Sequence, residues 1–127
     1  MINTYIPYFK KKDQNILSQC LKTNFVSTAG PLVKKFEDNF SKEYNFKYSV
    51  ALNSGTSALH LGLKAIGVKN GDTVILPSYT FAATANAVIY NNAHPWFFDC
   101  NENFEFSLNQ IEKTLKSKIY HAVLTKI

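Results

Sequence analysis

The stretch GDTVILPSYTF (residues 71–81) decides the fold class of this chain. A polar turn leads into Thr73–Leu76, an apolar run that is too short for a helix. The run also lacks the apolar–polar alternation of a strand with one solvent-exposed face. Such runs are typical of parallel strands that are covered on both faces. Pro77 ends the run, and the residues from about Thr80 to Tyr90 have the composition of a helix. The stretch therefore predicts a buried strand followed by a crossover helix.

The same alternation continues on both sides of this stretch. It predicts strands at Tyr48–Leu52, Pro95–Phe98 and Ala122–Thr125, a helix from Thr56 to about Ile66, and a helix from a Ser107 cap to about Leu115. Strands that alternate with helices are typical of an α/β fold with a mostly parallel sheet and crossover helices. A sheet that stopped after Ala122–Thr125 would keep an unpaired apolar edge. We therefore expect an incomplete sheet that folds poorly alone.

The first 46 residues have a different pattern. Asp13 is a candidate N-cap for a helix that runs to about Lys22, because aspartate at that position accepts backbone hydrogen bonds. Pro31 stands where the first position of a second helix is expected, since proline fits there. The sequence thus predicts an N-terminal helical segment over residues 1–46 and an α/β part over residues 47–127.

The composition excludes several classes of protein. The 127 residues are 46% hydrophobic, and a formal charge of +5 comes from scattered lysines with no arginine. Scattered charge of this kind is usually a solvated surface, and arginine, the usual reader of base edges, is missing. No stretch resembles a signal peptide or a membrane helix, and Cys20 and Cys100 have no disulfide or metal spacing. We predict a cytoplasmic protein without a nucleic-acid or membrane partner.

One candidate site is the segment LNSGTSA (residues 52–58), where a predicted strand runs through a small polar turn into a helix. Gly55 would allow a ligand to approach the backbone closely. The free amides of Thr56 and Ser57, together with the positive end of the helix dipole, would attract a phosphate. A Ser/Thr helix cap explains the same residues equally well, and the Walker A and GxGxxG spacings are absent.

A second candidate site follows the next strand, at Pro77–Phe81. Ligands of open parallel sheets bind beyond the carboxyl ends of the strands, and an aromatic ring there can lie on a planar ligand. The commoner explanation is that Tyr79 or Phe81 belongs to the core. The carboxylates after the third strand are candidates for acid–base chemistry, but an ordinary acidic loop is the commoner explanation. They are Asp99, Glu102 and Glu105. The histidines, His60, His94 and His121, lack the spacing of metal ligands.

The order and spacing of these motifs closely resemble the DegT/DnrJ/EryC1/StrS aminotransferases. The resemblance rests on NSGTSAL (53–59), GDTVILPSYTF (71–81), AATANA (82–87), the earlier VSTAGP (26–31) with Phe36-Glu37, and Phe98-Asp99. It covers residues 5–124. It implies the N-terminal part of the large domain of a fold-type-I enzyme that uses pyridoxal 5'-phosphate, with residues 47–127 as the first part of that cofactor-binding domain.

The resemblance also implies roles for individual residues. The amides around Gly55, Thr56 and Ser57 would hold the cofactor phosphate, and Phe81 would stack on the pyridine ring. The phosphate and stacking interpretations therefore become the preferred ones at both candidate sites. The substrates implied are a nucleotide-linked keto sugar and an amino donor, with glutamate expected, in amino-sugar or surface-polysaccharide synthesis. The complete enzyme is expected to be a homodimer with shared active sites.

The chain departs from the family pattern in one respect that bears on activity. The family's cofactor-binding lysine, its ring-nitrogen aspartate and its small C-terminal domain lie beyond the matched stretch, and no lysine here falls in the lysine motif. Without that lysine there is no internal Schiff base, so we expect the isolated chain to be inactive. The alternatives are a non-catalytic remnant that binds a phosphate ligand or pairs with a full-length copy, and a Rossmann-like nucleotide binder.

Overall fold

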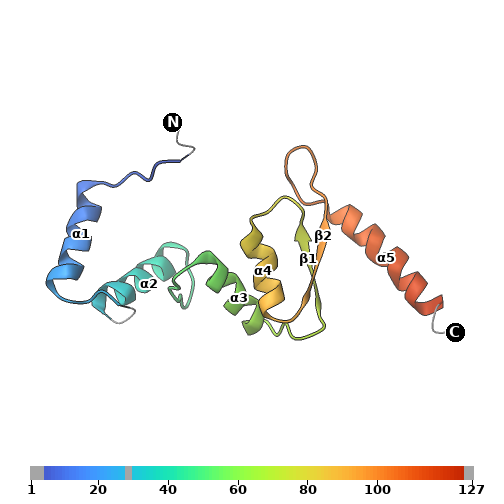
Figure 1. Cartoon of the computed structure of the whole chain (residues 1–127), viewed down its shortest axis with the longest axis horizontal. Helices are drawn as coiled ribbons and strands as arrows, with labels where there is room; N and C mark the ends of the chain where they lie inside the picture. The colour runs from blue at the N-terminus through green and yellow to red at the C-terminus, as the bar shows by residue number, and fades with distance from the viewer. Residues whose placement is uncertain (1–4, 28–29, 125–127) are drawn as a thin grey trace. The chain divides into compact units, whose positions relative to one another are not determined.

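The computed structural model describes residues 5–27 and 30–124, and for residues 118–124 the backbone alone. The chain divides into two compact units, Met1–Ala51 and Leu52–Ile127. In the described ranges the first unit contains two helices, and the second contains three helices and a pair of strands. Figure 1 shows their order along the chain. None of the helices in the described ranges is both long and apolar enough to span a membrane.

Helix α1 of the first unit spans Lys11–Lys22, and its N-cap is Lys10. The prediction of Asp13 as the N-cap was therefore wrong by one turn of helix. The Asp13 carboxylate lies inside the first turn and accepts a 2.8 Å hydrogen bond from the Lys10 backbone amide. An acidic side chain at this third position satisfies the amide that precedes the helix and interacts favourably with the helix dipole.

Helix α2 spans Pro31–Glu43 with Pro31 at its first position, as the sequence predicted. The chain then turns back, and the Phe46 amide donates to the Ser41 carbonyl at 2.8 Å. The strand predicted at Tyr48–Leu52 is not formed. A strand requires a neighbour that shares its backbone hydrogen bonds, and in the described ranges the Ala51 amide bonds instead to the side chain of Glu37.

The second unit contains a parallel pair of strands joined by a crossover helix, which confirms the predicted α/β class (Figure 1). Strand β1 (Thr73–Pro77) pairs with β2 (His94–Phe98) in a register that runs from Thr73 opposite His94 to Pro77 opposite Phe98. Helix α4 (Ala82–Tyr90) connects them. Helix α3 (Gly55–Ala65) precedes β1 and packs against α4.

Helix α5 (Leu108–Leu124) follows β2 and is longer than expected. Ser107 caps it as predicted, because its Oγ accepts from the Gln110 amide at 3.3 Å. The strand predicted at Ala122–Thr125 was wrong up to Leu124, where the helix continues, and Thr125 lies outside the described residues. A run of three apolar residues does not distinguish a strand from the end of a helix by periodicity alone.

The core of the second unit forms where α4 covers the strand pair. Leu76, Val88 and Ala93 are buried together, and Val88 has no exposed surface. Leu63 from α3 and Val68 pack against them. The Val68 amide donates to the Leu63 carbonyl at 3.0 Å, and Gly67 between helix and Val68 has a φ of +94°. This Schellman motif at the carboxyl end of α3 directs Val68 back onto the core.

Candidate functional site

The turn before α3 presents two free backbone amides. Ser54 is the N-cap, and its Oγ accepts a 3.1 Å hydrogen bond from the Ser57 amide. The helix-cap interpretation of this turn is therefore correct, and it accounts for one amide of the first turn. In the described ranges no hydrogen bond engages the amides of Gly55 and Thr56. Amides at the start of a helix without partners are an anion-binding arrangement.

Gly55 is not required by the fold itself. Its backbone is helical, its φ is not positive, and a Cβ built on it would meet no protein atom within 4 Å. A glycine at the start of a helix loses more conformational entropy on folding than an alanine would. The space beside Gly55 is open within the described chain, and a ligand in that space would come close to the amides of Gly55 and Thr56.

Phe81 occupies the N-cap position of α4, where it contributes no capping hydrogen bond. Serine, threonine, aspartate and asparagine are the usual residues there. The Phe81 side chain is 82% exposed, so the explanation that it belongs to the core does not hold within the described structure. Tyr79 is also exposed, and its ring lies 4.5 Å from that of Phe104. An aromatic face is therefore available beside the carboxyl end of β1.

Asp99 connects the carboxyl ends of the two strands. Its Oδ1 accepts from Ser78 Oγ at 3.0 Å and from the Cys100 amide at 2.9 Å. The Ser78 amide donates to the Phe98 carbonyl at 2.7 Å. These bonds fix the start of the segment that carries Phe81. The sequence predicts Asp99 near this edge but not its bond to Ser78, because a contact over 21 positions leaves no local pattern.

Asp99 and Glu105 make separate contacts. Glu105 accepts from the Asn101 side chain at 3.0 Å within the loop after β2. Across the described residues no three histidine, cysteine, aspartate or glutamate side chains are grouped so that they could hold a metal ion.

The two candidate elements, residues 55–57 and Phe81, begin neighbouring helices. Helices α3 and α4 pack against each other, and Asn91 Nδ2 donates to the His60 carbonyl at 3.3 Å. The His60 and Tyr90 rings lie 5.8 Å apart. These contacts lie at the middle of α3 and the carboxyl end of α4, and within the described residues no hydrogen bond or ring contact joins Phe81 to residues 55–57.

Comparison with known proteins identifies the same family that the motifs indicate. Residues 7–125 match the DegT/DnrJ/EryC1/StrS aminotransferase family. GDP-perosamine synthase of Escherichia coli O157:H7 is 36% identical over 118 residues, which are 92% of this chain and 32% of that protein. The spore coat polysaccharide biosynthesis protein SpsC of Bacillus subtilis (strain 168) is 39% identical over 105 residues, 80% of this chain and 27% of SpsC.

The solved structures agree with this assignment. The putative sugar aminotransferase Spr1654 from Streptococcus pneumoniae, in its PLP form, superposes with a TM-score of 0.74 at 28% identity. The match covers 84% of this chain and 27% of that one. The chain spans about a third of the length of the curated relatives it matches. It belongs to the DegT/DnrJ/EryC1/StrS family of aminotransferases, which depend on pyridoxal phosphate.

Proposed function

We propose that this chain is the N-terminal portion of a pyridoxal-phosphate-dependent aminotransferase that acts on a nucleotide-linked keto sugar. The names of its relatives support this substrate class, since perosamine is carried on GDP in one relative and another serves polysaccharide biosynthesis. The product would enter amino-sugar or surface-polysaccharide synthesis. The family resemblance alone supports glutamate as amino donor, a homodimer and a cytoplasmic location.

The observation that carries the proposal is the pair of free amides at Gly55 and Thr56 beside an open space at Gly55. These amides and the Ser57 hydroxyl bind the cofactor phosphate, with the amino end of α3 adding its positive dipole. The exposed ring of Phe81 stacks on the pyridine ring and orients it. The residues present therefore fit the cofactor.

Pyridoxal phosphate, when bound, supplies the electron sink for moving an amino group between donor and keto sugar. This chain contributes binding and orientation to that chemistry. We place the first part of the cofactor-binding domain at residues 47–127, preceded by a helical segment at 1–46. We propose that the lysine which forms the family's Schiff base lies outside the matched residues, so that this chain alone would not catalyse transamination.

Gly55→Ala tests the phosphate site because its effects on stability and on binding have opposite signs. Alanine is favoured over glycine in helices by up to about 1 kcal/mol, and its Cβ meets no protein atom. The variant should be at least as stable as the parent chain, yet bind both inorganic phosphate and pyridoxal phosphate less tightly in equilibrium dialysis. Equal affinity in parent and variant would contradict the phosphate site.

Gly62→Ala is the matched control, since Gly62 lies in the same helix and also has open space around it. It should raise stability by a similar amount and leave the affinity for both ligands unchanged. A loss of affinity in Gly62→Ala as well would show that the effect of Gly55→Ala comes from the helix and not from the proposed site.

Phe81→Ser separates ring binding from phosphate binding. Serine is a good N-cap, so this variant should stabilise α4 by about 1 kcal/mol. It should lower the affinity for pyridoxal phosphate and leave the affinity for inorganic phosphate unchanged, because a stacking ring recognises only the former. An unchanged affinity for pyridoxal phosphate would remove Phe81 from the site.

The alternative function is a non-catalytic remnant that binds a phosphate ligand or pairs with a full-length copy. The free amides are consistent with both functions, so the DNA downstream decides between them. A following reading frame that encodes a lysine-bearing continuation supports the enzyme. The lack of one favours the remnant.

A further inference from the structure

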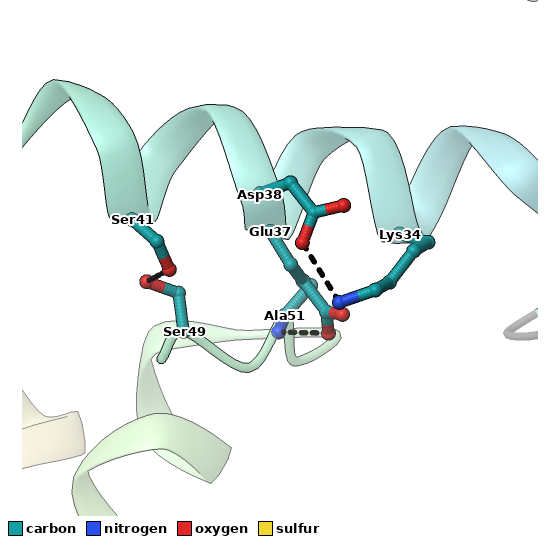
Figure 2. Close-up of polar contacts among 6 residues, drawn as sticks. All are labelled: Lys34, Glu37, Asp38, Ser41, Ser49 and Ala51. Carbon is teal, nitrogen blue, oxygen red and sulfur yellow. Dashed lines mark hydrogen bonds and ion pairs between the residues drawn. The ribbon is translucent and has the colours of Figure 1, made fainter. Parts of the chain in front are cut away.

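Two side chains on one face of α2 hold the segment that leads toward the proposed phosphate turn (Figure 2). Glu37 Oε1 accepts a 2.9 Å hydrogen bond from the backbone amide of Ala51. One turn further along the helix, Ser41 Oγ lies 2.8 Å from Ser49 Oγ. All four residues are half-buried and belong to the first unit.

The spacing of these contacts matches a helix against an extended chain. Glu37 and Ser41 are four residues apart on α2, a rise of about 6 Å. Ala51 and Ser49 are two residues apart, which is about 6.6 Å in extended backbone. The order is reversed, since the earlier helix residue contacts the later segment residue. Segment 49–51 is therefore bound at two points as it runs back along α2.

The contact at Ala51 provides a bond that the fold does not otherwise supply. Residues 48–52 form no strand, so in the described ranges the Ala51 amide has no backbone partner. A carboxylate acceptor makes a stronger bond to an amide than a neutral acceptor does. The lysine one turn away does not compete for it, because Lys34 Nζ pairs with Asp38 Oδ1 at 2.7 Å (Figure 2).

We propose that Glu37 is a positioning residue for the cofactor-phosphate turn. Ala51 is three residues before Ser54, the N-cap of α3, so the intervening backbone can extend about 10 Å at most. Fixing the Ala51 amide limits the conformations that Ser54, Gly55 and Thr56 sample before a ligand arrives. Preorganisation of this kind lowers the ordering cost of binding. The inference rests on the proposed function, but its first test needs no ligand.

The test is amide hydrogen exchange of the full chain without ligand, followed by NMR at Ala51 and at Ser57. The Ser57 amide reports on the turn because it donates to Ser54 Oγ. In Glu37→Ala both amides should exchange faster, by on the order of tenfold at Ala51 and roughly threefold at Ser57, in keeping with the loss of one charged hydrogen bond. An unchanged exchange rate at Ser57 would overturn the proposal.

Two further variants separate positioning from a general loss of structure. Glu37→Gln keeps a side-chain oxygen at the same reach but loses the charge, so it should bring exchange at Ser57 part of the way back to the parental rate. Glu37→Asp keeps the charge but shortens the side chain, so it should behave like Glu37→Ala. The same result in Glu37→Gln and Glu37→Asp would contradict the proposal, even if Glu37→Ala failed to fold.

Ser41→Ala is the control for Glu37→Ala, because it removes the neighbouring contact with Ser49 and should leave the Ala51 amide protected. A titration with inorganic phosphate then addresses the proposed function separately. If the parent chain binds no phosphate, the phosphate site fails, while slower Ser57 exchange in parent than in Glu37→Ala still supports positioning. If the parent binds and Glu37→Ala binds equally well, the positioning role fails and the site stands.

Discussion

The two units differ in what they bury. In residues 5–27 and 30–51 no residue is buried, and the apolar face of α2 is only partly covered, since Leu32 and Val33 are half-buried and Phe36 is 57% exposed. In residues 52–117 the core residues Leu76, Val88 and Phe98 are buried. The second unit contains strand, crossover helix and strand within 26 residues, and its apolar surfaces therefore meet nearby in the sequence. A helix without such a partner leaves its amphipathic face uncovered.

The largest expected effect separates the cores of the two units. Val88→Ala removes two methyl groups from a side chain without exposed surface, so it should lower the free energy of unfolding by about 2 kcal/mol. Phe36→Ala removes a larger but mostly exposed side chain and should cost less than 1 kcal/mol. Urea unfolding followed by Trp96 fluorescence measures the loss of unfolding free energy in Val88→Ala, since Trp96 lies in β2 of the same unit. Equal losses would mean that the units are equally well packed.

A smaller effect separates the helix caps of the two units. Ser54→Ala removes the acceptor of the Ser57 amide and should cost about 1 kcal/mol in the unfolding of the second unit. Asp13→Ala removes the bond to the Lys10 amide in α1, a helix with no buried residue. That change should lower the helix signal in circular dichroism without shifting the unfolding midpoint of the second unit. A midpoint shift from Asp13→Ala would show that the units unfold together.

The smallest effect concerns a surface ion pair of α2. The hydrogen bond that Lys34 Nζ donates to the Asp38 carboxylate raises the pKa of Lys34 above its usual value. A raised pKa stabilises the folded state below the unfolded pKa of about 10.4, and this contribution is lost as the pH rises through the folded pKa. Asp38→Asn should return the pKa of Lys34 toward its usual value in an NMR titration. No change in thermal stability is expected at pH 7, because both side chains are exposed.

The sequence predicted the parts of the fold that depend on local pattern. The run Thr73–Leu76, Pro31 at a helix start and the Ser107 cap were confirmed because each acts through neighbouring residues. The strand at Tyr48–Leu52 was wrong because forming a strand depends on a partner elsewhere in the chain. The Asp13 cap was wrong by one turn, since aspartate stabilises a helix both at the N-cap and inside the first turn.

The candidate site was predictable in its residues but not in its supports. Gly55, Thr56, Ser57 and Phe81 stood out because their motif is contiguous, and their roles toward the cofactor stay predictions. The bond from Glu37 to the Ala51 amide left no trace in the sequence, because a side chain that binds backbone 14 positions away places no demand on the identity of residue 51.

The proposed cofactor contacts are tested most directly by an NMR titration of the ¹⁵N-labelled chain with pyridoxal phosphate, followed by borohydride reduction and peptide mapping. We expect saturable shifts at the amides of Gly55 and Thr56 and beside Phe81, with no single lysine labelled. One uniquely labelled lysine, or shifts that avoid Gly55 and Thr56, would contradict the claim that this chain supplies the phosphate and ring contacts without the catalytic lysine.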